Sequence, residues 1–147
     1  MTKTIYHLSH IDLDGYSCQL VMAQTQHTMI SYNANYGAEV MDRLEEIIER
    51  IKKAKQTATI LITDLNLYPE EAKWLNQEVT RLNEGGWDIT ITLLDHHGSG
   101  KDTAAQYPWY FLDTERCATK IVYEYAMEHY GLSGGGWLEA FVKVVNA

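Results

Sequence analysis

The stretch LLDHHG at residues 93–98 decides how the rest of the chain is interpreted. An apolar run that predicts a β-strand stops here, and a carboxylate and two imidazoles follow at once. Aspartate and histidine side chains bind metals and carry protons, and burying them without partners costs several kcal/mol each. We therefore expect this strand end to bind a ligand.

Two other predicted strands end in the same way. The run TIYHLS at residues 4–9 leads into HIDLDG at residues 10–15, and ATILIT at residues 58–63 leads into Asp64. In an open α/β sheet, ligands lie outside the carboxyl ends of the parallel strands. The three ends supply four carboxylates and three imidazoles, which is more than turns and helix caps explain. His7 lies inside a strand, so we expect it to be a satisfied core histidine and not a ligand.

Length and composition narrow the possible classes of protein. The chain has 147 residues, of which 46% are apolar and 22% are charged, as in a single globular domain. A net charge of −8 excludes a broad basic face, so a polyanionic substrate would be met locally by metal ions or by a few cationic side chains. Signal-peptide and membrane-spanning patterns are absent from the sequence. We expect a cytoplasmic protein without a membrane partner, whose two cysteines are reduced and buried.

Hydrophobic patterns predict strands that alternate with helices. The predicted strands cover residues 4–9, 29–33, 57–63, 87–94 and 107–112, and the predicted helices cover residues 15–27, 40–51, 69–84, 115–129 and 137–145. This order is typical of a doubly wound α/β domain with a mostly parallel five-stranded sheet and helices on both faces. Pro108 places the fifth strand at a sheet edge. Asp113 or Thr114 is expected to cap the fourth helix, and Ser133 the last one.

The ligand types at the strand ends favour particular metals. Aspartate and imidazole without thiolate suit Mn²⁺, Mg²⁺ or Fe²⁺ better than a structural zinc site. His10, Asp12 and Asp14 alternate, which places them on one side of an extended segment. Two metal ions ~3.5–4 Å apart activate a water and clamp the oxygens of phosphoryl transfer, and such a pair needs several carboxylates. The chain has the parts of a dinuclear hydrolase.

These motifs resemble a known family. The pattern HxDxDG at residues 10–15, the isolated Asp64 and the DHH triplet at residues 95–97 resemble motifs I, II and III of the DHH phosphoesterases. Residues 113–125 are similar to the helix that follows in that family, so the resemblance covers essentially the whole chain. The glycine that follows Asp14 makes the first motif resemble one branch of the family more than the pyrophosphatase branch. The branch it resembles includes single-strand exonucleases, short-oligonucleotide hydrolases and cyclic-dinucleotide hydrolases.

The resemblance implies a function and a role for each motif residue. It implies hydrolysis of a phosphodiester substrate, such as a short oligonucleotide or cyclic dinucleotide, by a water that two Mn²⁺ ions activate, with Mg²⁺ as an alternative. Its metal ligands would be His10 and Asp12 for one ion, Asp14 and His96 for the other, and Asp64 between them. His97 would face the scissile phosphate as a donor, and Asp95 would orient the histidines.

The chain departs from the family pattern in two respects. The family supplies a fourth aspartate from a later motif and carries a C-terminal substrate domain. The sequence SGGG at residues 133–136 does not replace the glycine-rich motif of that domain and is typical of a turn. We expect residues 1–147 to be the N-terminal catalytic domain, without the substrate-binding domain. The substrate and the oligomeric state stay open, and a homo-oligomer is compatible with the sequence.

Two cationic side chains are candidates for substrate contacts. Lys101 ends the sequence GSGK at residues 98–101, which resembles the tail of a P-loop but lacks its first glycine and its final Ser or Thr. The segment is either a mobile loop near phosphate or an exposed turn. Arg116 begins the helix after the fifth strand and is either an anion contact or a surface residue.

Three other functions remain as alternatives. A haloacid-dehalogenase-type phosphatase also uses DxDG, as at residues 12–15, with the first aspartate as nucleophile. That mechanism leaves His10 and the DHH triplet unexplained, and Tyr16 stands where threonine is usual. The second alternative is a phosphoanhydride hydrolase that acts on polyphosphate or pyrophosphate. The third is a domain that binds metal for regulation and catalyses nothing.

Overall fold

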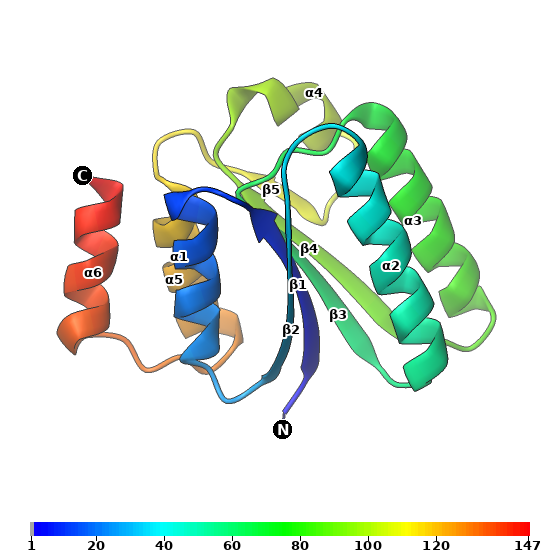
Figure 1. Cartoon of the computed structure of the whole chain (residues 1–147), viewed down its shortest axis with the longest axis horizontal. Helices are drawn as coiled ribbons and strands as arrows, with labels where there is room; N and C mark the ends of the chain where they lie inside the picture. The colour runs from blue at the N-terminus through cyan, green and yellow to red at the C-terminus, as the bar shows by residue number, and fades with distance from the viewer. Residues whose placement is uncertain (1) are drawn as a thin grey trace.

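The computed structural model describes residues 2–147 and contains one parallel sheet with helices on both faces (Figure 1). The strand order is β2-β1-β3-β4-β5, and all four pairings are parallel. The strands are β1 (Thr4–His10), β2 (Thr28–Ala34), β3 (Ala58–Thr63), β4 (Ile89–Asp95) and β5 (Tyr110–Leu112). The predicted doubly wound α/β class is confirmed, with a sheet that is wholly parallel.

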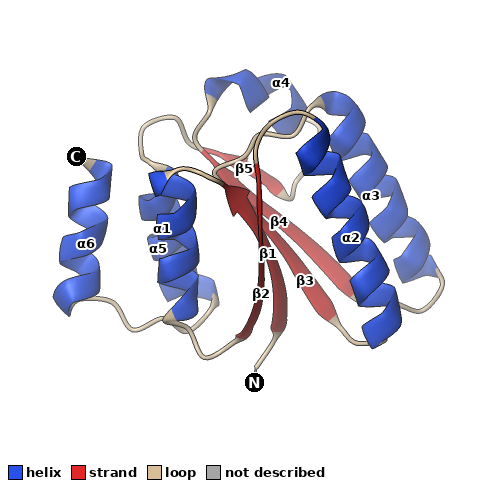
Figure 2. Ribbon diagram, viewed as in Figure 1, coloured by secondary structure: helices blue, strands red, loops and turns tan. Residues whose placement is uncertain are grey.

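The helices cover the sheet in two layers (Figure 2). Helices α1 (Leu13–Ala23) and α5 (Ala118–His129) lie on one face, with α6 (Gly136–Asn146) outside them. Helices α2 (Ala38–Ala54) and α3 (Pro69–Glu84) lie on the other face, and the short α4 (Lys101–Ala104) lies near the carboxyl ends of the strands. This arrangement leaves those strand ends as the place where loops from both layers meet.

Alternation along the central strand separates two hydrophobic cores. All six residues of β3 are buried. Ile60 and Ile62 pack toward α2 and α3, whereas Leu61 packs toward α1 and α5. Because successive side chains of a strand point to opposite faces, a strand covered on both sides is apolar throughout. The two cores hold the ends of β1, β3 and β4 in a rigid frame.

Several local predictions were wrong. Strand β5 contains only residues 110–112, because Pro108 has no N–H to donate to the sheet. It is nevertheless an edge strand, as predicted. Helix α5 begins at Ala118 with Cys117 as its N-cap, so neither Asp113 nor Thr114 caps it. Residue 135, and not Ser133, precedes α6 as its N-cap.

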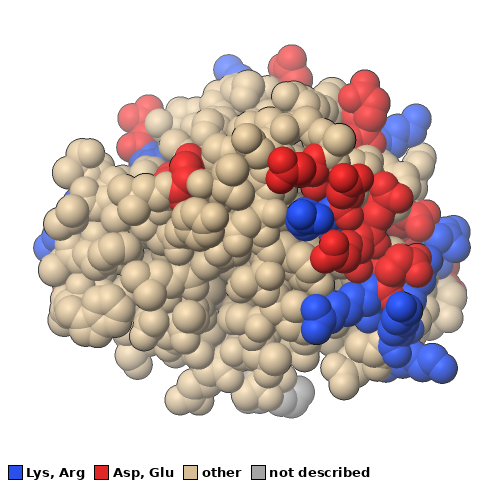
Figure 3. All heavy atoms as spheres, in the orientation of Figure 1, with Lys and Arg blue, Asp and Glu red and all other residues tan. Residues whose placement is uncertain are grey.

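The face shown in Figure 3 carries a group of acidic side chains over α2. Glu39, Asp42 and three further glutamates of α2 are exposed, and lysines follow at its carboxyl end. The charged residues of α2 thus form a solvated face. Both cysteines are free, and Cys117 is half-exposed, whereas the sequence predicted that both would be buried. In the described part of the chain, no helix is long and apolar enough to span a bilayer.

Candidate metal centre

The strand order brings the three polar strand ends together. Strand β3 lies between β1 and β4, so Asp64, directly after β3, lies between the residues that follow its two neighbours. One group of possible ligand atoms, all within 4.8 Å of one another, contains Asp64, Asp95, His96 and His97. A second such group contains His10, Asp12 and Asp64. Asp64 therefore belongs to both groups.

The turn after β1 is shaped by a hydrogen bond and a close packing contact. Asp12 is the N-cap of α1, and its Oδ1 accepts the Gly15 N–H at 2.8 Å. A Cβ atom at residue 15 would collide with the carbonyl oxygen of His10. Glycine is thus required for α1 to start so close to the end of β1, and this turn places His10 and Asp12 beside Asp64. Nδ1 of His10 lies 2.9 Å from Oδ2 of Asp12 and 3.9 Å from Oδ2 of Asp64.

Asp64 has an unusual backbone and a fully buried side chain. Its φ is 56°, in the left-handed region that residues other than glycine rarely adopt. Its N–H donates to the carbonyl oxygen of Leu94 at 3.1 Å, which ties this conformation to β4. Its side chain has an exposed fraction of 0%, and Oδ1 lies 3.1 Å from Nε2 of His96. Backbone strain of this kind accumulates at functional sites.

The two histidines of the DHH triplet contact different carboxylates. Nε2 of His96 approaches Asp64 and also lies 3.3 Å from Oδ2 of Asp14. His97 turns to the buried Asp95, with 2.7 Å between its Nδ1 and Oδ1 of the carboxylate. A carboxylate at Nδ1 fixes the orientation of the ring and directs Nε2 away from the carboxylate.

Asp14 is held by the start of α5. Its two carboxylate oxygens accept the backbone N–H groups of Ala118 and Thr119 at 3.0 and 2.9 Å, and Oδ1 also accepts the Thr119 hydroxyl. A carboxylate at a helix N-terminus is favoured by the dipole and by the free N–H groups. Asp14 was predicted as a metal ligand, whereas its contact with Thr119 was not predicted. The sequence signals near this contact were the predicted helix start at residue 115 and the resemblance of residues 113–125 to a helix of the family.

His7 is buried inside β1 and belongs to neither ligand group, as predicted, but it is only half satisfied, because its Nδ1 has no hydrogen-bond partner. Its Nε2 lies 2.8 Å from Oγ1 of Thr63, whose hydroxyl donates to Oγ of Ser9 at 2.8 Å. The Ser9 hydroxyl in turn lies 3.0 Å from the carbonyl oxygen of Gly15. Burial lowers the pKa of His7 to about 3, so the ring is neutral.

The electrostatics of the cluster show an excess of negative charge. Burial, with the neighbouring Asp12 and Asp14, raises the pKa of Asp64 to about 7, against the lowering effect of His96. Burial also opposes ionisation of Asp12, but its contacts with Asp64, the Gly15 N–H and His10 outweigh it and lower the pKa of Asp12 to about 2. The pKa values of the two carboxylates thus shift in opposite directions, as expected where like charges share one site.

The pKa values of the two histidines of the triplet are raised as well. The hydrogen bond to Asp64 raises the pKa of His96, and the hydrogen bond to Asp95 raises that of His97. Both shifts mean that the site favours added positive charge. Protons supply that charge when cations do not.

The residues present fit divalent cations. Within residues 2–147, five buried side-chain atoms have no hydrogen-bond partner, and three of them belong to this cluster: Nδ1 of His10, Oδ2 of Asp64 and Oδ2 of Asp95. Buried polar atoms are normally satisfied, so orphaned atoms in both ligand groups, which meet at Asp64, fit bound ions. Carboxylate and imidazole donors match Mn²⁺ and Mg²⁺.

The two cationic side chains proposed for substrate binding lie elsewhere. Arg116 forms ion pairs with Asp113 and with Glu124 of α5. Lys101 is exposed at the start of α4, where it lines a shallow surface with Tyr110 and other residues of the β5 region. The structure does not bring either residue into the metal cluster, and their contact with substrate stays a prediction.

Two curated proteins are similar in sequence to this chain. No family model matches the chain. It is 48% identical to the 3',5'-cyclic-nucleotide phosphodiesterase of Helicobacter pylori (strain ATCC 700392 / 26695), over 97% of this chain and 42% of that protein. It is 29% identical to Oligoribonuclease NrnB of Bacillus subtilis (strain 168), over 97% of this chain and 36% of that protein. The chain thus spans less than half the length of the curated relatives it matches.

A solved structure has the same fold. The crystal structure of an uncharacterized protein from Helicobacter pylori G27 superposes with a TM-score of 0.93 at 49% sequence identity. The match covers 98% of this chain and 43% of that one. The doubly wound arrangement of the five strands is therefore shared with an experimentally determined protein.

Proposed function

We propose that this chain is the catalytic part of a DHH-type phosphoesterase that hydrolyses phosphodiester bonds of nucleotides. The observation that carries the proposal is the position of Asp64, which lies in both groups of converging ligand atoms. A carboxylate shared by two sets of donors is what a pair of neighbouring cations requires. The relatives named as a cyclic-nucleotide phosphodiesterase and an oligoribonuclease support the substrate class.

The cations would be held by residues from three strand ends. The candidate ligands are His10, Asp12, Asp14, Asp64 and His96, with Mn²⁺ as the proposed metal and Mg²⁺ as the alternative. Bound divalent cations would supply Lewis acidity at the phosphoryl oxygens and lower the pKa of water. Burial and the neighbouring carboxylates raise the pKa of Asp64 to about 7, so binding of divalent cations there would release protons.

His97 has the geometry of a donor to the substrate. Its Nδ1 is engaged by buried Asp95 at 2.7 Å, and the pKa of His97 is raised by that contact. A protonated imidazole with one nitrogen fixed in this way presents its other N–H to a phosphate oxygen. Asp95 therefore acts by positioning His97, and His97 is the proposed catalytic contact to the substrate.

Hydrolysis of the dinucleotide pApA in Mn²⁺ tests the proposal. The Asp64→Asn variant is expected to lose activity by on the order of 100-fold or more, because it removes the charge shared by both ligand groups. Asp42→Asn, which removes an exposed carboxylate of α2, is the matched control and should retain the wild-type rate. A wild-type chain that leaves pApA, cyclic dinucleotides and bis(p-nitrophenyl) phosphate intact would overturn the proposal. Equal rates for wild type and Asp64→Asn would also overturn it.

A further inference from the structure

A hollow of about 400 Å³ lies directly beside the candidate metal centre. This volume falls within the range of about 300–1,000 Å³ that is usual for small-molecule sites. His97 forms part of its wall and so connects it to the cluster. The other residues that the argument uses are Tyr36, Asn66, Tyr68, Ser99 and Asp102.

Aromatic rings form a continuous path from the cluster into the hollow. The ring centroid of Tyr36 lies 5.1 Å from that of His10 and 6.3 Å from that of His97. Tyr68 follows, with 6.4 Å between its centroid and that of Tyr36. The Tyr36 hydroxyl accepts the backbone N–H of Asn66 at 3.2 Å, which fixes this ring in place.

Tyr68 presents an aromatic surface that the fold does not use. It is the residue before α3, where its backbone N–H donates to Glu71 at 2.8 Å, and its exposed fraction is 47%. The backbone thus anchors the residue while the ring stays accessible. A rigid, half-exposed ring beside a reaction centre is suited to stacking on a planar ligand.

The charges around the hollow indicate which part of a nucleotide it accepts. Neither lysine nor arginine is among its described lining residues, whereas Asp102 contributes a carboxylate. A phosphate would therefore be repelled from its outer wall. A neutral base avoids that repulsion and finds polar partners in Asn66 and Ser99.

We propose that this hollow, the base pocket, holds the nucleobase of the substrate by stacking on Tyr68 and Tyr36. The inference rests on the proposed function, because it assumes that a phosphodiester lies at His97. It adds a substrate class to that function: the chain recognises nucleotides through the π-face of a base, which every base has. Sequence-tolerant binding of short nucleic acid fragments follows.

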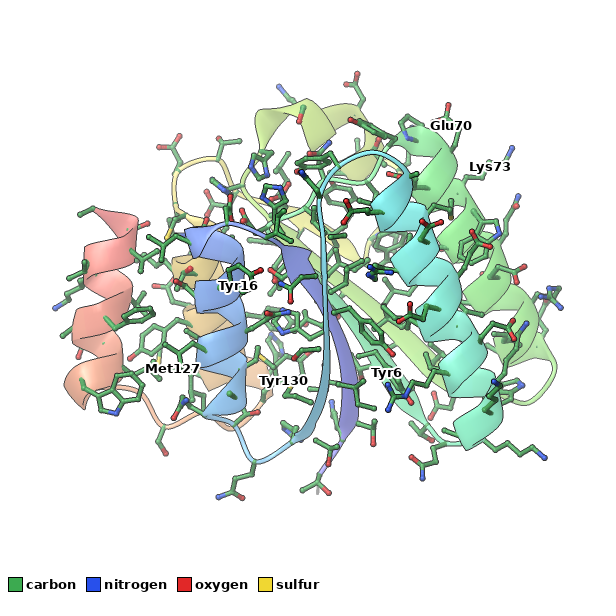
Figure 4. All side chains as sticks on the ribbon, in the orientation of Figure 1. Tyr6, Tyr16, Glu70, Lys73, Met127 and Tyr130 are labelled. Atoms are coloured by element: carbon green, nitrogen blue, oxygen red, sulfur yellow. The ribbon has the colours of Figure 1, made fainter. Side chains whose placement is uncertain are left out.

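Binding of adenosine 5'-monophosphate and of ribose 5-phosphate, measured by calorimetry in Mn²⁺, separates the base from the sugar phosphate. The wild type should bind the nucleotide more tightly than ribose 5-phosphate. Tyr68→Ala should weaken nucleotide binding by on the order of 5- to 100-fold and remove this preference. Tyr68→Phe should keep it. Tyr16→Ala removes a similarly exposed tyrosine, which is 52% exposed and lies outside the hollow. This residue lies on α1 (Figure 4), and its variant should match the wild type.

Different experimental results would overturn the base pocket and the proposed function. Equal affinity for the two ligands, no binding of either, or wild-type nucleotide affinity in Tyr68→Ala would overturn the base pocket, even if pApA is hydrolysed. A preference for the nucleotide that depends on Tyr68, in a chain that cleaves no phosphodiester, would overturn the proposed function and leave the base pocket standing. Thermal unfolding of Tyr68→Ala at the wild-type temperature excludes misfolding as the cause of weak binding.

Discussion

Asp14 and Thr119 are joined by a hydrogen bond of 2.9 Å from the Thr119 N–H to Oδ1 of Asp14, across 105 residues of sequence. The Thr119 hydroxyl donates to the same oxygen. Oδ2 of Asp14 lies 3.3 Å from Nε2 of His96. The start of α5 therefore sets the position of a carboxylate that belongs to the first motif and contacts the third.

Replacing Thr119 tests this relationship. Thr119→Val keeps the shape of the side chain but removes the hydroxyl donor from a partly buried carboxylate, and it should lower the free energy of unfolding by about 1.5–3 kcal/mol. Thr119→Ser keeps the donor and should recover most of this loss. Urea denaturation measures both. Equal stability of the valine and serine variants would show that the hydroxyl contact to Asp14 contributes nothing.

Removing the shared carboxylate should change metal binding. Calorimetric titration of the wild-type chain with Mn²⁺ is expected to show two ions, and Asp64→Asn should weaken or abolish both, because Asp64 belongs to both ligand groups. Asp42→Asn changes the net charge equally and should leave both ions bound. A single weak site that does not respond to Asp64→Asn would contradict the shared-ligand arrangement.

A methyl group at residue 15 should disturb the turn between β1 and α1. In Gly15→Ala, the new Cβ would collide with the His10 carbonyl oxygen, and overpacking of this kind costs about 1–3 kcal/mol. The mutation should also weaken Mn²⁺ binding, since the turn positions His10 and Asp12. Gly98→Ala is the control, because a Cβ there meets no atom within 4 Å. Chemical denaturation that ranks the two variants equally would rule out this steric role.

Acid should destabilise the protein through His7. Its pKa is about 3 in the folded state and about 6.5 in the unfolded chain, so between these values only the unfolded state takes up the proton. The contribution of the neutral ring is complete above pH 6.5 and falls by up to about 1.4 kcal/mol per pH unit below it. Denaturation midpoints at several pH values measure this dependence.

The NMR signal of the His7 ring provides a direct check. It should keep the chemical shift of a neutral imidazole from pH 8 down to pH 5, where the protein is still expected to be folded. A titration midpoint near pH 6.5 in the folded protein would contradict the buried, neutral state. Substitution by glutamine should flatten the acid side of the stability profile.

Local pattern was enough to predict most of the elements. The apolar run before Asp64 and the amphipathic spacing of α2 are properties of neighbouring residues, because strand and helix periods are set by the backbone itself. The helix caps and the length of β5 could not be predicted in the same way. Tertiary contacts decide where a helix such as α5 begins, and so Cys117, not Asp113, became its N-cap.

The sequence by itself determined that Asp64 and the DHH triplet lie at carboxyl ends of parallel strands, because strand ends and the α/β order are local features of the chain. Only the tertiary structure decided which of them meet. The order β1-β3-β4 puts Asp64 at the centre, α5 clamps Asp14 through Thr119, and ion pairs hold Arg116 away. The base pocket at Tyr68 likewise depends on how separate loops pack, since a hollow is a property of distant segments brought together and has no sequence period.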